Sequence, residues 1–212
     1  MDITLPILFA STVGFGHAFE ADHLVAVSNL VSKRNKIELA IKDGIFWGLG
    51  HTSTILLVGS IVILGKLTFK EEDFRYEEAG VGLMLMLLGF FRIFKILNNK
   101  TKSQENQPHS HHHSHQNFSL AYGVGAIHGL AGSGALVLSV MTQIKGNANM
   151  LIYLLTFGLG SIFGMMVASA FFSFPFSSKV TQNKWVKLTL SVGSSLLCLV
   201  IGFSILKQNL SF

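Results

Sequence analysis

Long stretches without a charged side chain constrain the fold of this chain more than any other feature. Residues 44–65, 118–144, 146–178 and 188–206 contain no Asp, Glu, Lys or Arg. About 20 helical residues cross the hydrocarbon core of a bilayer, so each stretch is long enough to span one. Charged residues make up 13% of the 212, about half the share in a soluble domain. The sequence therefore predicts an all-α polytopic membrane protein, in which the single cysteine, Cys198, is a buried apolar side chain.

Two further segments complete a prediction of six transmembrane helices. Residues 79–97 qualify if Arg92 and Lys95 extend toward the membrane surface. Residues 3–31 are apolar apart from four ionisable side chains, and we interpret them as a helix rather than a signal peptide because no basic residue precedes them. We expect residues 1–98 to form a first group of three helices, 99–117 a polar loop, and 118–212 a second group of three.

The distribution of basic residues predicts the orientation in the membrane. Eleven of the sixteen Lys and Arg residues lie at or after the ends of the first, third and fifth spans, and cytoplasmic loops carry such an excess. Both termini are therefore expected outside the cell. The same rule explains the net charge of +5 without a nucleic-acid partner. The eleven residues are Lys33, Arg34, Lys36, Lys42, Arg92, Lys95, Lys100, Lys102, Lys179, Lys184 and Lys187.

The two halves of the chain resemble each other at an offset of about 110 residues. The recurring patterns are Gly48–His51 with Gly158–Ser161, Gly89-Phe90 with Gly202-Phe203, and His17 and Ser28 with His128 and Ser139. Because each half holds three spans, the second half must cross the membrane in the opposite sense. Such a 3+3 inverted repeat is typical of transporters whose site lies near the midplane. The ionisable side chains are not duplicated: Glu20, Asp22, His23 and His51 fall opposite Ala131, Ser133, Gly134 and Ser161.

Four ionisable residues lie within seven positions of the first predicted span: His17, Glu20, Asp22 and His23. A charge at mid-bilayer costs about 2.5 to 3.5 kcal/mol on insertion scales, so such a cluster persists only if its members pair or hold a ligand. On a regular helix Glu20 lies between His17 and His23 on one face. Asp22 then points elsewhere and could orient a histidine from behind, unless the helix is irregular after Gly14 and Gly16.

Two more histidines, His51 and His128, lie at membrane depth in the second and fourth spans. Imidazole together with carboxylate suits divalent nickel, cobalt, zinc, copper or iron, whereas calcium and magnesium prefer oxygen ligands alone. A lone histidine in a membrane helix is usually a hydrogen-bonded core residue, but three spans carry one here. We therefore predict a metal site formed by His17, His23 and His51, with His128, Asp22 and Glu20 as further candidates.

Two polar loops carry additional candidate metal-binding side chains. The loop after the third span contains His109, His111, His112, His113 and His115, a composition typical of disordered, metal-chelating segments. In the cytoplasm such a loop could buffer incoming metal, present metal for export, or do neither. An acidic cluster on the outer side comprises Glu71, Glu72, Asp73, Glu77 and Glu78. It could concentrate cations there, although a solvated loop is the simpler interpretation.

Three motifs resemble those of the nickel/cobalt transporter (NiCoT) family. His17-Ala-Phe-Glu-Ala-Asp22-His23 matches the family signature His-x-x-x-x-Asp-His, and residues 46–54 resemble its following-helix motif. Residues 127–136 look like the fourth span of the UreH-type branch. The resemblance implies that His17, Asp22 and His23 are essential for metal recognition and that His51 belongs to the same site. The larger members differ: they have eight spans, and Asp where this chain has Glu20.

The sequence thus predicts a transporter of Ni²⁺ or Co²⁺ in the cell membrane, and not an enzyme. We expect uptake that supplies nickel enzymes such as urease, by alternating access, with the metal as substrate and no prosthetic group. An efflux carrier with the same site is the nearest alternative. An intramembrane zinc hydrolase is disfavoured by the absence of H-E-x-x-H, and a passive accessory subunit would not need ionisable groups in lipid. The oligomeric state stays open.

Overall fold

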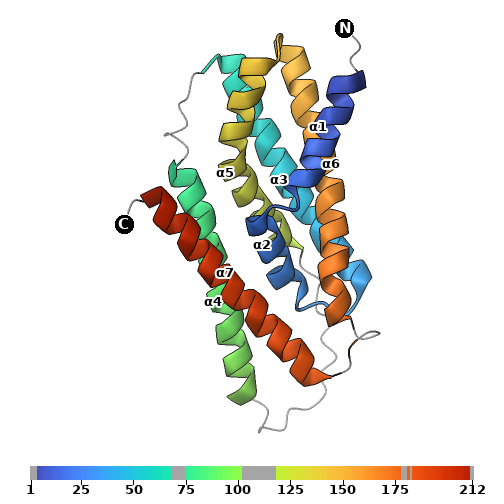
Figure 1. Cartoon of the computed structure of the whole chain (residues 1–212), viewed down its shortest axis with the longest axis vertical. Helices are drawn as coiled ribbons and strands as arrows, with labels where there is room; N and C mark the ends of the chain where they lie inside the picture. Colours follow the sequence, from blue (N-terminus) through green and yellow to red (C-terminus); the bar gives the residue numbers. More distant parts are fainter. Residues whose placement is uncertain (1–3, 68–74, 102–117, 178–180, 182, 211–212) are drawn as a thin grey trace.

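A computed structural model describes residues 4–67, 75–101, 118–177, 181 and 183–210, and this part of the chain is helical without strands (Figure 1). The six predicted spans correspond to its longer helices, with the first span divided in two. The elements are α1 (Thr4–His17), α2 (Ala21–Val31), α3 (Ile37–Gly65), α4 (Arg75–Thr101), α5 (Ser119–Gln143), α6 (Asn147–Ser173), the 3₁₀ turn η3 (Phe174–Phe176) and α7 (Lys184–Leu210).

Four segments within the described residues are long and apolar enough to cross a membrane: Ile37–Gly65, Arg75–Asn98, Asn147–Phe176 and Lys184–Leu210. Large apolar side chains on the outside of these helices fit a lipid environment, since Phe90, Phe91, Phe94 and Phe203 are all exposed. The chain is therefore a multi-pass helical protein. The other two of the six predicted spans, α1–α2 and α5, stay predictions.

Helix α3 lies at the centre of one group of helices, packed against both α5 and α6, while α1 packs on α6. Helices α4 and α7 form a separate pair that runs side by side along the edge of the bundle (Figure 1). The short helix α2 lies between the two groups and contacts α6, α7 and α4. In this junction Cys198 is fully buried, as predicted, and its thiol donates to the Val25 carbonyl oxygen at 3.5 Å.

Glycines allow the helices of the larger group to approach closely. A Cβ atom on Gly14 would lie 2.0 Å from the carbonyl oxygen of Phe157, and one on Gly125 would lie 2.0 Å from that of Trp47. Any side chain at these positions would collide with the neighbouring backbone. Small residues of this kind are the usual means of close helix packing in membranes.

The first span is not one continuous helix, so that part of the sequence prediction is wrong. Helix α1 ends at His17 and α2 begins at Ala21, while Glu20 has an extended backbone with φ −65° and ψ 153°. The amides of Phe19 and Glu20 donate to the carbonyls of Gly16 and His17 at 2.9 and 3.1 Å, which forms a tight turn. The regular helix is therefore ruled out, and the irregular alternative after Gly14 and Gly16 takes the form of a complete break. Non-helical backbone is tolerated at membrane depth where it lines a cavity.

Helix α2 is anchored to its neighbours by buried polar contacts. Asn29 donates to the hydroxyl of Ser195 on α7 at 3.1 Å. In the turn that follows, Arg34 forms a bidentate pair with Asp43 at 2.5 and 2.6 Å, and Asp43 is only 1% exposed. The α2–α3 turn lies at the opposite end of the bundle from the N-terminus (Figure 1). This pair therefore ties α2 to α3 at that end.

Candidate metal centre

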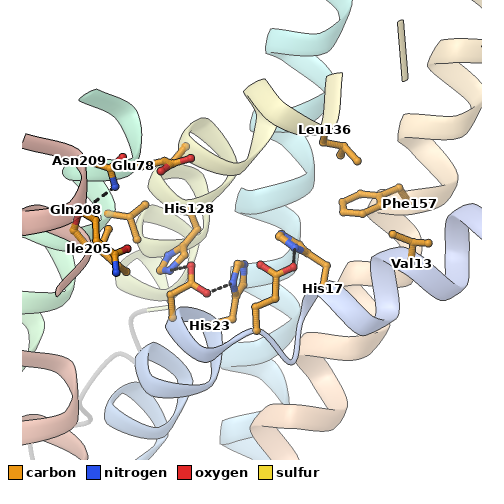
Figure 2. A pocket seen from close by; sticks show the side chains of 14 residues that line it. Val13, His17, His23, Glu78, His128, Leu136, Phe157, Ile205, Gln208 and Asn209 are labelled. Atoms are coloured by element: carbon orange, nitrogen blue, oxygen red, sulfur yellow. Dashed lines mark hydrogen bonds and ion pairs between the residues drawn. The ribbon is translucent and has the colours of Figure 1, made fainter. Parts of the chain in front are cut away.

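A cavity of about 530 Å³ opens where the break between α1 and α2 faces the other helices. Figure 2 shows His128, His23 and His17 in a row along one side of it. Glu78 from the first turn of α4, with Gln208 and Asn209 from the last turn of α7, lies at one end of the cavity, and Val13 and Phe157 lie at the other. The break therefore brings the ionisable side chains of the first span to the wall of this cavity.

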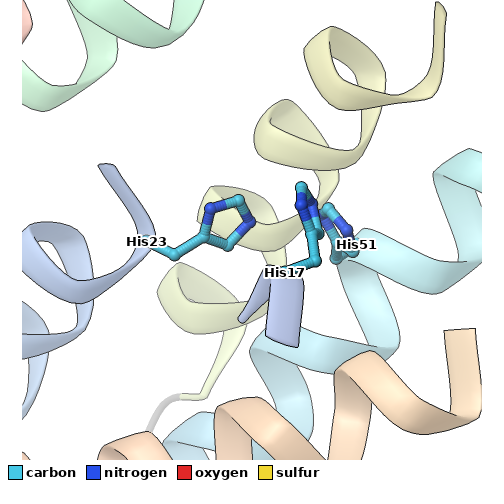
Figure 3. A group of neighbouring side chains, drawn as sticks. All are labelled: His17, His23 and His51. Carbon is cyan, nitrogen blue, oxygen red and sulfur yellow. The ribbon is translucent and has the colours of Figure 1, made fainter. Parts of the chain in front are cut away.

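Three histidines from three helices converge beside this cavity: His17 and His23 line it, and His51 lies buried behind them. His17 closes α1, His23 lies in the first turn of α2, and His51 lies in the middle of α3. One potential ligand nitrogen from each lies within 4.8 Å of the other two. The ring centroids are 4.6 to 5.3 Å apart, and one nitrogen of His23 faces the other two rings (Figure 3). The structure thus brings together the three residues that the sequence ranks first.

A second group of three donors comprises Asp22, His23 and His128, again with ligand atoms within 4.8 Å of one another. The Asp22 carboxylate lies 3.1 Å from Nδ1 of His23 and 3.7 Å from Nε2 of His128. On a regular helix Asp22 would point away from the histidines, so its position follows the irregular alternative that the sequence leaves open. The break after His17 rotates α2 and turns Asp22 inward. His23 belongs to both groups.

Glu20 has a different environment from Asp22. Its carboxylate bonds to Nδ1 of His17 at 2.8 Å, but 57% of the side chain is exposed. Glu20 is not a member of either group of donors among the described residues. In this arrangement Glu20 orients the His17 ring, as carboxylates commonly do beside metal-binding histidines.

Several buried ring nitrogens of these histidines have no hydrogen-bond partner within the described part of the chain. They are Nε2 of His23, both nitrogens of His51 and Nε2 of His128. An unsatisfied buried polar group costs about 1 to 3 kcal/mol, so four of them together are expensive without a ligand. Neutral imidazole offers one lone pair for a metal. The donor set therefore suits a transition-metal dication better than Mg²⁺ or Ca²⁺, which require oxygen ligands.

Two aromatic side chains that sequence reasoning did not identify form walls of the site. The indole of Trp47 stacks on His23, with ring centroids 5.7 Å apart, and meets His128 at 5.5 Å. Phe157 lies 5.4 Å from His17. The available signal was position: Trp47 precedes His51 by one helical turn, and Phe157 is its counterpart 110 residues later. These two rings pack against these three imidazoles and give each of them an apolar neighbour on one side.

The second half of the chain contributes less chemistry to the site. His128 comes from α5, and Ser161, the counterpart of His51, donates to the Gly14 carbonyl oxygen at 3.0 Å. Glu78 lines the cavity, whereas Glu71, Glu72 and Asp73 of the predicted acidic cluster lie outside the described residues. The predicted chelating loop with His109, His111, His112, His113 and His115 also lies outside them.

These features define the class of the protein: a multi-pass helical membrane protein with a histidine-lined internal cavity. The chain is 32% identical over 203 residues to the urease accessory protein UreH of Bacillus sp. (strain TB-90), which covers 89% of this chain and 87% of that protein. The chain belongs to the nickel/cobalt transporter family, in its UreH-type branch.

Two shorter similarities agree with this assignment. The chain is 29% identical over 90 residues to the nickel transporter NixA of Staphylococcus aureus and 30% identical over 92 residues to the high-affinity nickel transport protein of Cupriavidus necator. These matches cover 41% and 42% of this chain, but only 26% of each of the two longer proteins. The relatives are transporters and an accessory protein rather than enzymes, in agreement with the sequence prediction. No protein-family model and no solved structure matches the chain.

Proposed function

We propose that the protein is a Ni²⁺ uptake permease of the cytoplasmic membrane, with Co²⁺ as an alternative cargo, and that it supplies nickel enzymes such as urease. The names of its relatives support this, because two are nickel transporters and one is a urease accessory protein. In this proposal the metal is a substrate and no prosthetic group is needed. Six spans cross the membrane, and both termini lie outside.

The observation that carries the proposal is the convergence of His17, His23 and His51 beside the cavity, which His17 and His23 line. Their ligand atoms lie within 4.8 Å of one another, which is close enough for a single ion to contact all three. Three nitrogen donors favour Ni²⁺, Co²⁺ and their neighbours over oxygen-seeking cations. Asp22 supplies a compensating negative charge beside them.

The helix packing supports the predicted 3+3 inverted repeat. When the two halves are exchanged, the contact of α1 with α6 corresponds to that of α5 with α3, and the pairs α3–α6 and α4–α7 map onto themselves. The close glycine contacts are exchanged in the same way. They are Gly14 on Phe157 with Gly125 on Trp47, Gly50 on Tyr122 with Gly160 on Ser11, and Gly82 on Gly202 with Gly89 on Ser195. Transporters with such repeats alternate access by moving one part against the other.

The position of the cavity supports uptake by alternating access. The end of the cavity at Glu78, Gln208 and Asn209 is formed by the first turn of α4 and the last turn of α7. The distribution of basic residues assigns these two turns to the outer face of the membrane. At the opposite end, α2 is buried and the Arg34–Asp43 pair ties it to α3. A metal ion reaching the histidines from outside would therefore leave only after α2 and its neighbours separate at the inner end.

Accumulation of radioactive nickel and cobalt in cells tests the proposal. We expect wild type to accumulate metal, His17→Ala to lose accumulation, and a deletion of residues 109–115 to keep at least part of it. Thr189→Ala is a matched control, because Thr189 is exposed on α7 and does not line the cavity. If the loop deletion alone abolishes accumulation, the site has been assigned to the wrong residues.

The direction of transport is tested separately by deleting the gene. Uptake predicts that the deletion strain loses the activity of its nickel enzyme and recovers it when excess nickel is supplied. Hypersensitivity to nickel in the deletion strain would instead identify the protein as an exporter.

A further inference from the structure

The two groups of donor atoms meet at one shared residue. His23 belongs to the group with His17 and His51 and to the group with Asp22 and His128. Its ring centroid lies 4.6 Å from that of His17, 5.3 Å from that of His51 and 4.7 Å from that of His128. The ring of His23 therefore stands between the two groups, with Nδ1 on the side of Asp22 and Nε2 without a hydrogen-bond partner.

The orientation of His128 leaves a gap for a cation beside Asp22. Nδ1 of His128 lies 3.2 Å from the carbonyl oxygen of Val124, to which it donates. In a neutral ring the lone pair is then on Nε2, which faces the Asp22 carboxylate oxygen at 3.7 Å without a hydrogen bond. Two electron-rich atoms thus face each other in a buried place, where His128 is only 2% exposed. A metal ion between them would satisfy both.

The two groups differ in their access to the cavity. Asp22, His23 and His128 all line it, and the Asp22 side chain is 25% exposed. In the other group His17 and His23 also line the cavity, and the His17 side chain is 16% exposed, but His51 is fully buried and does not line it. The Asp22 group therefore lies entirely along the cavity and is the outer one, whereas the other group extends from the cavity to the buried His51 and is the inner one.

We infer that the transported metal occupies two positions in succession, an outer one on Asp22, His23 and His128 and an inner one on His17, His23 and His51. This inference rests on the proposed transport function and describes how the ion passes through its site. Because a neutral imidazole has one lone pair, His23 serves one position at a time, and its ring proton moves to the nitrogen that the metal leaves. The protein therefore holds one ion, which His23 transfers inward.

The two positions have different chemical roles. The outer position contains a carboxylate, whose negative charge attracts any dication that reaches the cavity. The inner position contains only imidazoles, which bind Ni²⁺ and Co²⁺ well and bind Mg²⁺, Ca²⁺ and Mn²⁺ poorly. Capture is thus assigned to Asp22 and His128, and discrimination between metals to His51.

Co²⁺ binding to the purified full-length protein tests the inference, since visible absorption reports binding and X-ray absorption reports the number of imidazole ligands. We expect one Co²⁺ per wild-type chain. His128→Gln should retain Co²⁺ on three imidazoles, and His51→Gln should retain it on two imidazoles and a carboxylate. His23→Gln should lose it. Thr189→Ala is again the control, and size-exclusion chromatography checks that each variant is folded.

Transport kinetics provide an independent readout. We expect His128→Gln to raise the apparent KM for Ni²⁺ by about 10-fold with little change in maximal rate, because capture is impaired. His51→Gln should lower the maximal rate by about 100-fold or more with a smaller change in KM.

Three results would overturn the two-position scheme: loss of Co²⁺ from both His51→Gln and His128→Gln, two Co²⁺ ions bound at once by wild type, or an unchanged KM in His128→Gln. Each of them leaves the proposed function intact if wild-type cells still accumulate nickel. Failure of wild type to move nickel or cobalt in either direction would instead reject the proposed function, whatever the binding pattern of the purified protein.

Discussion

The two halves of this chain share a packing pattern but differ in chemistry. Gly14 packs on the Phe157 backbone in one half as Gly125 packs on the Trp47 backbone in the other. His17, His23 and His51 all belong to the first half, whereas the second half contributes His128 and places Ser161 opposite His51. Small residues recur in both halves because close helix packing is needed in both. The ligands do not recur, because a single metal ion needs only one complete set of them.

The same comparison applies to the backbone at the site. After His17 the first half breaks and restarts at Ala21, whereas α5 continues as a helix beyond His128. The break turns both Asp22 and His23 toward the cavity. The half that carries Asp22 and His23 is therefore also the half whose helix breaks, whereas the helix at the corresponding position of the other half is continuous.

The largest effect is expected when the shared ligand is removed. His23→Ala should reduce nickel accumulation by about 100-fold or more, because removal of residues that only support metal ligands already costs about 10- to 100-fold. Ser161→Ala, which alters the second half near the site, should reduce accumulation far less. Uptake by whole cells, normalised to protein in the membrane, measures both. Equal losses in the two variants would contradict the unequal roles of the halves.

The two carboxylates of the first half are expected to differ. Asp22→Asn should weaken metal binding by about 10- to 100-fold, because the side chain contacts two histidines and is partly buried. Glu20→Gln should have a smaller effect, because Glu20 is 57% exposed and contacts only His17. Titration of the purified variants with Ni²⁺ measures the difference. The assignment of Asp22 to the site fails if Glu20→Gln is the more damaging change.

Glycine substitutions test the shared packing directly. Gly14→Ala and Gly125→Ala should each lower the free energy of unfolding by about 1 to 3 kcal/mol, since a Cβ at either position meets a carbonyl oxygen. Gly123→Ala is the control, because a Cβ there meets nothing within 4 Å. Thermal unfolding in detergent ranks the three variants. A clear difference between Gly14→Ala and Gly125→Ala would show that the halves are not equivalent in packing.

The smallest effect is expected from the loop between the halves. Deletion of residues 109–115 should change the initial rate of nickel uptake by about 2-fold or less at saturating metal, because both groups of donor atoms remain. A larger effect at low nickel concentration would indicate that the loop buffers metal. Initial rates across a range of nickel concentrations separate these two results.

Much of this organisation follows from the sequence because the lipid environment leaves few alternatives. Uncharged stretches predict helices, and ionisable residues inside them predict a site, which is why the sequence singles out His17, His23, His51 and His128, four side chains that the structure places close together. For Asp22 the sequence left two positions open, since Gly14 and Gly16 permit a break without requiring one and the turn depends on contacts such as the one between His17 and Glu20.

Two other features of the structure depend on tertiary contacts. Asp43 directly precedes an uncharged stretch, and nothing local indicates that it is buried against Arg34. Trp47 stacks on His23, but the two residues lie on separate helices, so no pattern along one helix predicts that they meet. Patterns along one helix reveal which residues face inward, but not which partners from other helices they meet.

The buried thiol of Cys198 offers a built-in probe of motion. It is the only cysteine in the chain, and it touches the Val25 carbonyl where α7 meets α2. Thiol-reactive labels can therefore follow this junction in the unmodified protein, without a cysteine-free background. If α2 and α7 separate during turnover, the rate of labelling should rise while nickel is being carried and fall again when the gradient is exhausted.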